Sequence, residues 1–348
     1  MRPEEAREAV KLARKSFGVL EGIFVPAPKS ALVAVLGGKI VGGFFYKVES
    51  FGGRKVGIAD FLFIDPSIQG LGVGKQLYEQ GIRLLREQDC DALMGIVRDD
   101  NVASWGRIVQ DGFVRGSLPK MVRLLGLSGV AKLFFTLYGL AIGHEYYIAL
   151  PDQEAARQYE KQERSFGQIL SYVLINLALA APLSLVVGDA ASFFAALLLV
   201  FLGSILTGYV GTLFSRRQWR FRLVSGGALV CLALSILNTP FRAFVPVVGN
   251  WYPTRYENTR AFQRDMAINA ISVWVFLLLL SASAAVLGDA GRVVAYLSGI
   301  ASVLLLFRCV PLAPIGSYGG ARVFAYNRVI FGLLVIASVF SVGVSLLF

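Results

Sequence analysis

The chain has 348 residues, a formal net charge of +11 and a mean hydropathy of +0.62. With 55% hydrophobic residues it is too apolar for an ordinary soluble protein, and its length favours two domains over one. A single histidine excludes any mechanism that needs two, and the three cysteines show neither metal-ligand spacing nor a framework of pairs.

The apolar residues are unevenly distributed along the chain. Residues 1–150 mix charged and apolar residues as a soluble domain does, residues 151–165 form a charged linker, and residues 166–348 are a series of long uncharged runs. The last segment holds 12 arginines, no lysine and four acidic residues. Because most of this positive surplus flanks apolar runs, it indicates membrane topology and contact with anionic lipid, and no nucleic-acid partner is expected.

The first 150 residues predict an α+β order of elements. In chain order we expect a helix at 3–17, strands at 31–36, 40–48 and 56–64, a helix at 74–88, a strand at 92–97 and a helix at 101–110. The first helix opens with Pro3 and acidic residues, which the helix dipole favours. Its charged pattern is not that of a signal peptide, so we expect this domain to lie in the cytoplasm.

A glycine-rich turn joins the third strand to the second helix. The sequence from Ile64 to Lys75 reads IDPSIQGLGVGK, an apolar strand end followed by three spaced glycines and a helix that begins near Gly74. Such a turn directs several backbone N–H groups and the positive end of a helix dipole at one point. Because glycine has no Cβ, the backbone can approach a bulky anion, and a pyrophosphate is the natural ligand.

The same stretch resembles the acetyl-CoA motif of the GNAT family of N-acetyltransferases, Gln/Arg-x-x-Gly-x-Gly/Ala, at Gln69, Gly72 and Gly74. Asn101 and the pair Gly112-Phe113 are similar to the family's Asn … Gly-Phe helix. The resemblance implies a mixed central sheet flanked by helices and acetyl-CoA as acyl donor. It also implies cofactor-binding roles for Phe63, Ile64, Gln69, Gly70, Leu71, Gly72, Val73, Gly74, Lys75 and Asn101.

Two positions bear on catalysis. Many relatives carry a tyrosine as general acid seven residues after the asparagine, and Ile108 stands there. Asp60 is the candidate general base, because it is the only charge in residues 56–64 and alternates onto the face of Leu62 and Ile64. The alternative is a structural carboxylate that caps a turn or pairs with an arginine.

Two further segments leave alternatives open. Residues 121–142 are mostly apolar, and they form either a helix that covers the sheet or one that lies flat on lipid. His144-Glu145 would need histidine at 148 for a His-Glu-x-x-His zinc site, and Ile148 stands there, so no metal is expected.

Residues 166–348 predict an all-α membrane domain with five or six transmembrane helices. The uncharged runs cover 166–188, 190–215, 223–241, 266–288, 293–307 and 329–348, and most are long enough to cross a bilayer. If 223–241 is a full span, Arg255, Arg260 and Arg264 fall outside the cell. If 223–250 instead enters and returns, they fall inside with Arg216 and Arg217, as the positive-inside rule requires.

Residues 308–324 are weakly similar to the Pro-rich ligand loop of site-2-type membrane metallopeptidases, but without a histidine or an aspartate to bind zinc. The sequence as a whole therefore predicts a multi-pass membrane protein whose cytosolic domain moves an acetyl group from acetyl-CoA to an unknown amine. The alternative is a catalytically degenerate GNAT domain that binds acyl-CoA and regulates the membrane domain.

Overall fold

The computed structural model describes residues 4–23, 25–68, 70–98, 102–116, 118–138, 143–149, 165–224, 226–241, 243–255, 257, 259–287, 291–312 and 315–345. These residues fall into two compact units. The first is drawn from the ranges Met1–Val97, Arg107–Thr136 and Tyr146–Lys161, and the second from Arg98–Gly106, Leu137–Glu145 and Gln162–Phe348. Most of the predicted linker at 151–165 lies outside the described residues, so the predicted domain boundaries stay a prediction.

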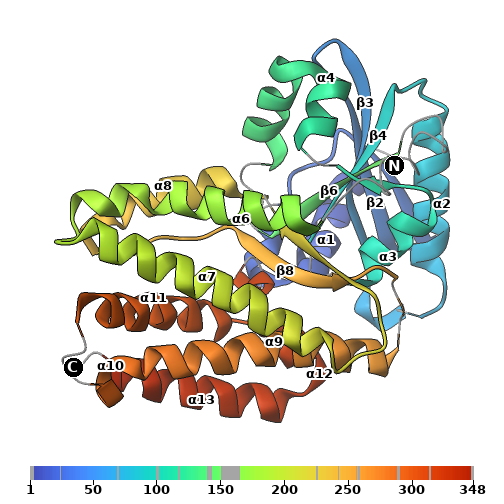
Figure 1. The fold of residues 1–348 in the computed structure, drawn as a ribbon. Coiled ribbons are helices and arrows are strands. Elements are labelled where there is room, and N and C mark those ends of the chain that lie inside the picture. Colours follow the sequence, from blue (N-terminus) through green and yellow to red (C-terminus); the bar gives the residue numbers. More distant parts are fainter. Residues whose placement is uncertain are drawn as a thin grey trace. The chain divides into compact units, whose positions relative to one another are not determined.

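The first unit is built on a mixed sheet with strand order β1-β2-β3-β4-β6-β5 (Figure 1). Its strands are β1 (Ser30–Leu36), β2 (Lys39–Phe51), β3 (Arg54–Ile64), β4 (Ala92–Arg98), β5 (Val114–Arg115) and β6 (His144–Ala149). The helices in this part of the chain are α1 (Glu5–Gly22), α2 (Val73–Arg86), α3 (Val102–Gln110, of which only the part from Arg107 onward falls in the first unit) and α4 (Leu118–Leu133). The first three strands are antiparallel hairpin neighbours, whereas β3 and β4 are parallel, so the predicted mixed sheet with flanking helices is confirmed.

Alternation along β2 decides which helix covers each face of the sheet. Phe44 meets Tyr78 of α2 edge to face, and a Cβ on Gly81 of the same helix would collide with its ring. The next residue, Phe45, belongs to a buried cluster with Ala9 and Ala13 of α1. Successive side chains of a strand point to opposite faces, so α2 lies on one face and α1 on the other.

The apolar segment at 121–142 supplies a helix that covers the sheet. Met121 and Leu125 of α4 are buried, and the helix packs against β2. Lys132 donates a hydrogen bond to the Ser50 carbonyl at 2.8 Å and lies over the Phe51 ring. Of the two alternatives drawn from the sequence, the covering helix therefore describes α4, while residues 139–142 lie outside the described residues.

The second unit is mainly helical (Figure 1). Its longer helices are α6 (Ser165–Ala180, continued by a 3-10 turn to Leu185), α7 (Ala190–Thr212), α9 (Arg260–Ser281), α11 (Arg292–Arg308) and α13 (Arg328–Ser345). The segments Ser165–Leu185, Ala190–Thr212, Arg260–Ser281 and Arg328–Ser345 are each long and apolar enough to cross a membrane. The apolar helix α11 has 17 residues, and the number of passes stays a prediction.

The run at 223–241 does not form one long helix. Strand β7 (Trp219–Val224) pairs antiparallel with β8 (Val248–Pro253), from Trp219 beside Pro253 to Val224 beside Val248. Between them the chain forms the ten-residue helix α8 (Ala228–Leu237). Ten residues rise about 15 Å, half of what a span needs. The β7–β8 pairing brings the chain back beside the strand from which α8 departs, and whether this segment spans a membrane or enters and returns stays a prediction.

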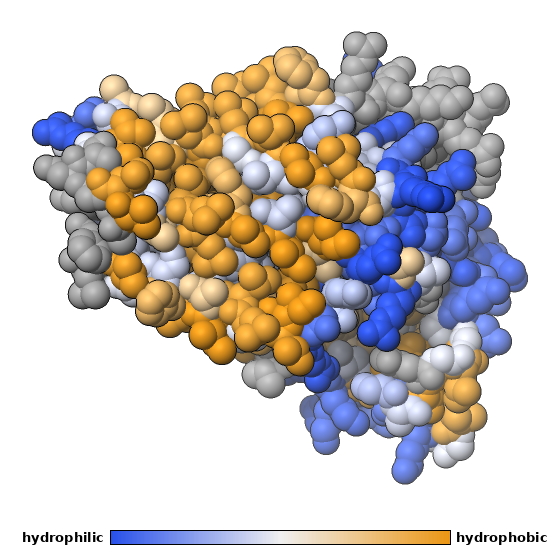
Figure 2. Space-filling view, turned by 60° about the horizontal axis from the view of Figure 1, so that its bottom comes forward, coloured by the Kyte–Doolittle hydropathy of each residue, from blue (hydrophilic) through white to orange (hydrophobic). Residues whose placement is uncertain are grey.

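Large apolar side chains are exposed on several long helices of the second unit. Figure 2 shows a broad apolar face on which such side chains gather. The exposed set includes Leu170, Leu174, Leu199, Leu202, Leu206, Leu279, Leu333, Ile336, Val339 and Phe340. A water-soluble protein rarely leaves so many large apolar side chains uncovered, so this surface is suited to hydrocarbon.

Candidate functional site

The strands β3 and β4 separate where β3 approaches the glycine turn. Their parallel pairing runs from Val56 beside Ala92 to Ala59 beside Gly95 and, among the described residues, goes no further. The remaining part of β3, Asp60 to Ile64, therefore has an edge that β4 does not cover. An exposed strand edge offers backbone donors and acceptors to an extended ligand. The Ile64 carbonyl already accepts a hydrogen bond from Ser16 Oγ at 3.1 Å.

A bulge in β3 marks the point of separation. Phe61 lies opposite Phe45 of β2 and Ala59 lies opposite Tyr46, so Asp60 is the extra residue between them. A bulge bends the strand and redirects a side chain, and such features are common beside active sites. The bulge therefore explains why β3 leaves β4 at this residue.

The turn after β3 is held by its own side chains. Asp65 accepts hydrogen bonds from the Ser67 backbone N–H at 2.9 Å and from Ser67 Oγ at 2.8 Å. These bonds, first the backbone one, lower the pKa of Asp65 from its ordinary value, with a further contribution from Lys15. The Asp65 N–H in turn donates to the Val41 carbonyl at 2.8 Å, which fixes the start of the turn to β2.

The turn ends at an uncapped helix N-terminus. Gly72 precedes α2 with φ of 81°, no side chain among the described residues caps the helix, and the first helical bond runs from Gln76 N–H to the Gly72 carbonyl. The N–H groups of Val73, Gly74 and Lys75 precede that bond and have no acceptor within the helix. Added Cβ atoms on Gly70 or Gly72 would meet nothing within 4 Å, so the described part of the chain leaves open space beside these two glycines.

Gly74 brings the helix start close to the end of β3. A Cβ on Gly74 would lie 3.3 Å from Ile64 Cγ1, so the end of the open strand edge and the start of the helix lie next to each other. The structure thus brings together Phe63, Ile64, Gly70, Leu71, Gly72, Val73, Gly74 and Lys75. Gln69 and Asn101, which the resemblance also implies, lie outside the described residues.

Asp60 has a partner that sequence reasoning did not name. Its carboxylate lies 3.0 Å from Lys47 Nζ of β2, and both side chains are about one-fifth exposed, at 21% and 19%. The Phe45–Phe61 and Tyr46–Ala59 pairs show that the two strands run antiparallel here, which places residue 47 beside the bulge. A visible signal existed, because Lys47 is the only cation between positions 40 and 53.

Ile108 occupies a structural position. It is 3% exposed, and a Cβ on Gly95 of β4 would lie on its side chain. The residue therefore fills the space between α3 and the sheet, and its aliphatic side chain cannot serve as the general acid that the family resemblance implies for this position. Among the described residues there is also no cluster of three His, Cys, Asp or Glu side chains that could hold a metal ion.

Comparison with known proteins identifies the N-terminal part of the chain. The family model described as the acetyltransferase (GNAT) family matches residues 4–113, so the prediction of a GNAT acetyltransferase domain is confirmed. The matched range contains the open strand edge, the glycine turn and the start of α2. No curated protein is similar enough to this sequence to be counted as a relative.

Several solved structures are similar to the same part of the chain. One is a GNAT family acetyltransferase from Brucella melitensis in complex with acetyl-CoA, with 22% identity, coverage of 33% of this chain and 79% of that chain, and a TM-score of 0.28. Another is the ribosomal-protein-S18-alanine N-acetyltransferase from Escherichia coli, with 15% identity, coverage of 42% of this chain and 87% of that chain, and a TM-score of 0.31. A third is the ribosomal-protein-alanine N-acetyltransferase from Brucella melitensis, with 19% identity, coverage of 34% of this chain and 67% of that chain, and a TM-score of 0.25.

Proposed function

We propose that this chain, whose residues 4–113 form a GNAT acetyltransferase domain, transfers an acetyl group from acetyl-CoA to an amine at the cytosolic face of a membrane. One observation carries the proposal. The open edge of β3 leads without interruption to the outward N–H groups at the start of α2. An extended pantetheine arm fits the first of these features, and a pyrophosphate fits the second.

The chemistry requires a neutral amine. An ammonium has no lone pair, so it must lose a proton before nitrogen attacks the thioester carbonyl; the C–N bond then forms, the C–S bond breaks and the thiolate leaves. Asp60 is the proposed base, because it lies at the bulge where the covered and open parts of β3 meet. Its carboxylate lies 3.0 Å from the Lys47 ammonium, which holds the side chain in place beside the open part of the strand.

The second unit holds the acetyltransferase at the bilayer in this proposal. Four segments long and apolar enough to span, together with large exposed apolar side chains, support an integral membrane protein. The β7–β8 hairpin supports an entering-and-returning path for the segment around α8. With that path, Arg216, Arg217 and Arg260 lie on one side of the membrane, and the positive-inside rule makes this side cytosolic.

A second candidate function is favoured by Ile108. A GNAT domain without its usual acid could bind acyl-CoA without efficient turnover and regulate the membrane unit. The side chain of Ile108 supports this alternative, because it is apolar, buried against Gly95 and unable to donate a proton to a leaving thiolate.

One experiment separates the two functions. Purified full-length protein in detergent is given acetyl-CoA and a panel of amines that includes aminolipids, polyamines and peptide N-termini, and thiol release is followed. Amine-dependent thiol release, with acetylated amine detected by mass spectrometry, supports the transferase. Saturable acetyl-CoA binding without release above the rate of hydrolysis for any amine supports the regulatory domain, and absence of binding contradicts both.

A further inference from the structure

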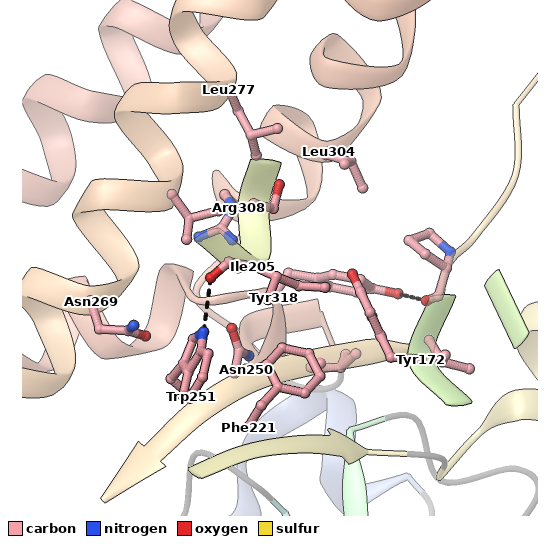
Figure 3. A pocket seen from close by; sticks show the side chains of 16 residues that line it. Tyr172, Ile205, Phe221, Asn250, Trp251, Asn269, Leu277, Leu304, Arg308 and Tyr318 are labelled. Carbon is pink, nitrogen blue, oxygen red and sulfur yellow. Dashed lines mark hydrogen bonds between the residues drawn. The ribbon is translucent and has the colours of Figure 1, made fainter. Parts of the chain in front are cut away.

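A cavity in the second unit contains a buried cation with no acidic neighbour. Its volume, as space for the centres of water molecules, is about 40 Å³, which is room for roughly three waters or one group of similar size. Figure 3 shows the side chains around it, among them Tyr172, Asn250, Asn269, Arg308 and Tyr318. The walls come from α6, α7, α9, α11, the β7–β8 hairpin and the 3-10 turn at Ile315–Tyr318.

Arg308 is the charged group of this cavity. Arg308 is only 8% exposed. Its NH1 donates a hydrogen bond to the Ala270 carbonyl at 3.3 Å. In the described part of the chain no carboxylate lies within ion-pair distance of its guanidinium, and none lines the cavity. The buried Arg322 is close enough to repel it. Isolated buried charge is costly, so an opposite charge in the cavity would be strongly favoured.

Most of the other polar groups in the wall are already bonded within the protein. The Asn250 amide donates to the Ser317 carbonyl at 3.0 Å, and the Asn269 amide donates to the Gly208 carbonyl at 2.7 Å. Trp251 Nε1 donates to the Ile205 carbonyl at 2.9 Å, and the Tyr318 hydroxyl donates to the Pro246 carbonyl. These bonds fix the shape of the wall, and each of these carbonyls already accepts one hydrogen bond.

Several side chains in the wall still have hydrogen-bond donors that are not used within the described protein. Ser204 Oγ is buried and, among the described residues, has no hydrogen-bond partner. A guanidinium has five N–H donors and no acceptor, and only one bond to Arg308 is accounted for above. The Tyr172 hydroxyl lies within electrostatic range of the same guanidinium. A small group with several acceptor oxygens and a negative charge would satisfy all three side chains together.

We propose that this cavity binds a single oxyanion group, a carboxylate or a phosphate, held by Arg308 with Ser204 and Tyr172. The volume admits the anionic group itself, so any larger ligand presents this group and keeps the rest of its structure outside. The group has two sources with the same chemistry, a free anion or the headgroup of an anionic lipid. The site is separate from the proposed acetyl-CoA site, and its occupation is measured without acetyl transfer.

The test uses thermal unfolding of the full chain in an uncharged detergent, followed by tryptophan fluorescence. A ligand that binds the folded form raises the melting temperature by an amount that grows with the logarithm of its concentration above the dissociation constant, which the titration therefore yields. One arm titrates sodium phosphate and sodium acetate against sodium chloride at equal ionic strength. The other arm titrates dihexanoyl phosphatidic acid against dihexanoyl phosphatidylcholine, both below their micelle concentrations. Stabilisation by the free anions identifies a soluble ligand, and stabilisation by phosphatidic acid alone identifies a lipid headgroup.

Three variants decide whether the effect comes from this cavity. Arg308→Gln should raise the dissociation constant of the stabilising anion about tenfold or more, since hydrogen bonds to charged groups are stronger than those between neutral groups. Ser204→Ala should raise this dissociation constant roughly two- to tenfold. It should leave the fold intact, because the Ser204 hydroxyl has no hydrogen-bond partner in the described protein. Arg292→Gln, at the exposed start of the same helix, is the matched control and should bind normally.

Two outcomes would overturn the proposal. One is that no oxyanion stabilises the wild-type chain more than chloride does. The other is that Arg308→Gln and Ser204→Ala respond to the stabilising anion as Arg292→Gln does. If Arg308→Gln does not fold, the comparison of Ser204→Ala with Arg292→Gln gives the decision.

Discussion

The ammonium of Lys47 lies 3.0 Å from the carboxylate of Asp60, at the bulge where β3 leaves β4. If Asp60 is the base, Asp60→Asn should keep acetyl-CoA affinity and lose about 10²-fold or more in turnover. The loss should shrink at high pH, where free amine is present without a base. Steady-state thiol release measured from pH 6 to 10 gives both values.

Lys47→Gln is the companion variant for this pair. It leaves the Asp60 carboxylate in place, so a catalytic Asp60 predicts a much smaller loss of turnover than in Asp60→Asn. A structural pair predicts instead that both variants lower the melting temperature alike and change turnover little at every pH. Unchanged turnover in a stable Asp60→Asn protein would remove this residue from the mechanism.

The Asp65 carboxylate should contribute to stability with a defined pH dependence. Its pKa is lowered by hydrogen bonds from Ser67, so the fold favours the ionised form. A group with a lowered pKa contributes fully above its ordinary value of 3.8 and loses its contribution as pH falls through the folded value, which lies below 3.8. The melting-temperature difference between wild type and Asp65→Asn should be constant above about pH 5 and should shrink below pH 3.8. A difference that grows on acidification would contradict the assignment.

The topology proposed above can be read by cysteine labelling. In a chain with Cys90→Ser, Cys231→Ala and Cys309→Ala, single cysteines are placed at the exposed positions Gln218 and Gly188. An impermeant thiol reagent applied to intact cells should label Gly188→Cys and leave Gln218→Cys unlabelled, while permeabilised cells should label both. Labelling of Gln218→Cys in intact cells would place the arginine-rich side of the second unit outside.

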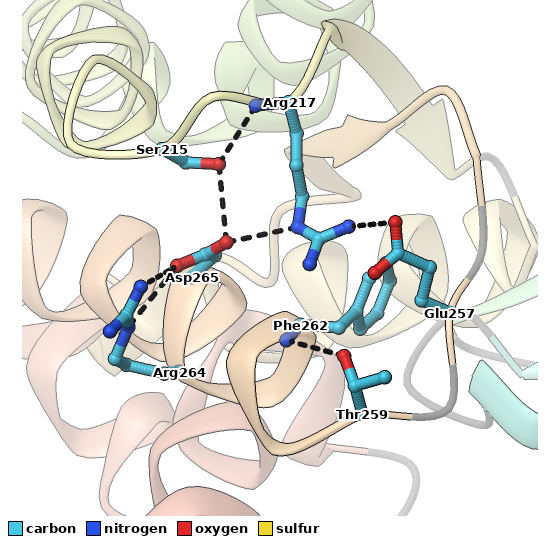
Figure 4. A network of polar contacts seen from close by, with 7 residues as sticks. All are labelled: Ser215, Arg217, Glu257, Thr259, Phe262, Arg264 and Asp265. Atoms are coloured by element: carbon cyan, nitrogen blue, oxygen red, sulfur yellow. Dashed lines mark hydrogen bonds and ion pairs between the residues drawn. The ribbon is translucent and has the colours of Figure 1, made fainter.

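A polar network ties the end of α7 to the start of α9 (Figure 4). Asp265 is 6% exposed and accepts from Arg217 Nε at 2.9 Å, from Arg264 at 3.2 Å and from Ser215 Oγ at 3.2 Å. Asp265→Asn should destabilise the chain by about 1–3 kcal/mol, because it removes the buried negative charge that pairs with the half-buried Arg217.

Glu257→Gln is the matched control for this network. Glu257 pairs with the same Arg217 at 2.6 Å but is 48% exposed, so its removal should change the melting temperature little. Equal losses of thermal stability in Asp265→Asn and Glu257→Gln would show that burial does not decide the strength of these pairs.

Local patterns were sufficient to predict most of the first unit. Alternating apolar residues predicted β1 to β4, and the glycine spacing predicted the turn before α2, because both features follow from local backbone geometry. The pairing of Asp60 with Lys47 was not predicted, because it depends on the register across a hairpin and on a bulge. A one-residue shift in register would have placed the two side chains apart.

The second unit shows a different limit. The sequence Trp219-Arg-Phe-Arg-Leu-Val224 alternates with period two, yet its arginines were interpreted only as a topology signal, and strand β7 was missed. The run at 223–241 has the composition of a membrane span. Only the pairing of β7 with β8, on either side of α8, shows that the chain turns back after this helix. The cavity around Arg308 joins six elements that are distant in sequence, and no local pattern predicts such a site.

The central claim is that the glycine turn before α2 binds the pyrophosphate of acetyl-CoA. Calorimetry on the full-length chain should show that Gly72→Glu weakens acetyl-CoA binding roughly 100-fold or more, because a carboxylate enters an anion site. Gly53→Glu is the control, with φ of 79° against 81° and equally open space in a turn remote from the site. It carries the same backbone strain and should bind normally. Unchanged affinity in a folded Gly72→Glu protein, or an equal loss in Gly53→Glu, would contradict the claim.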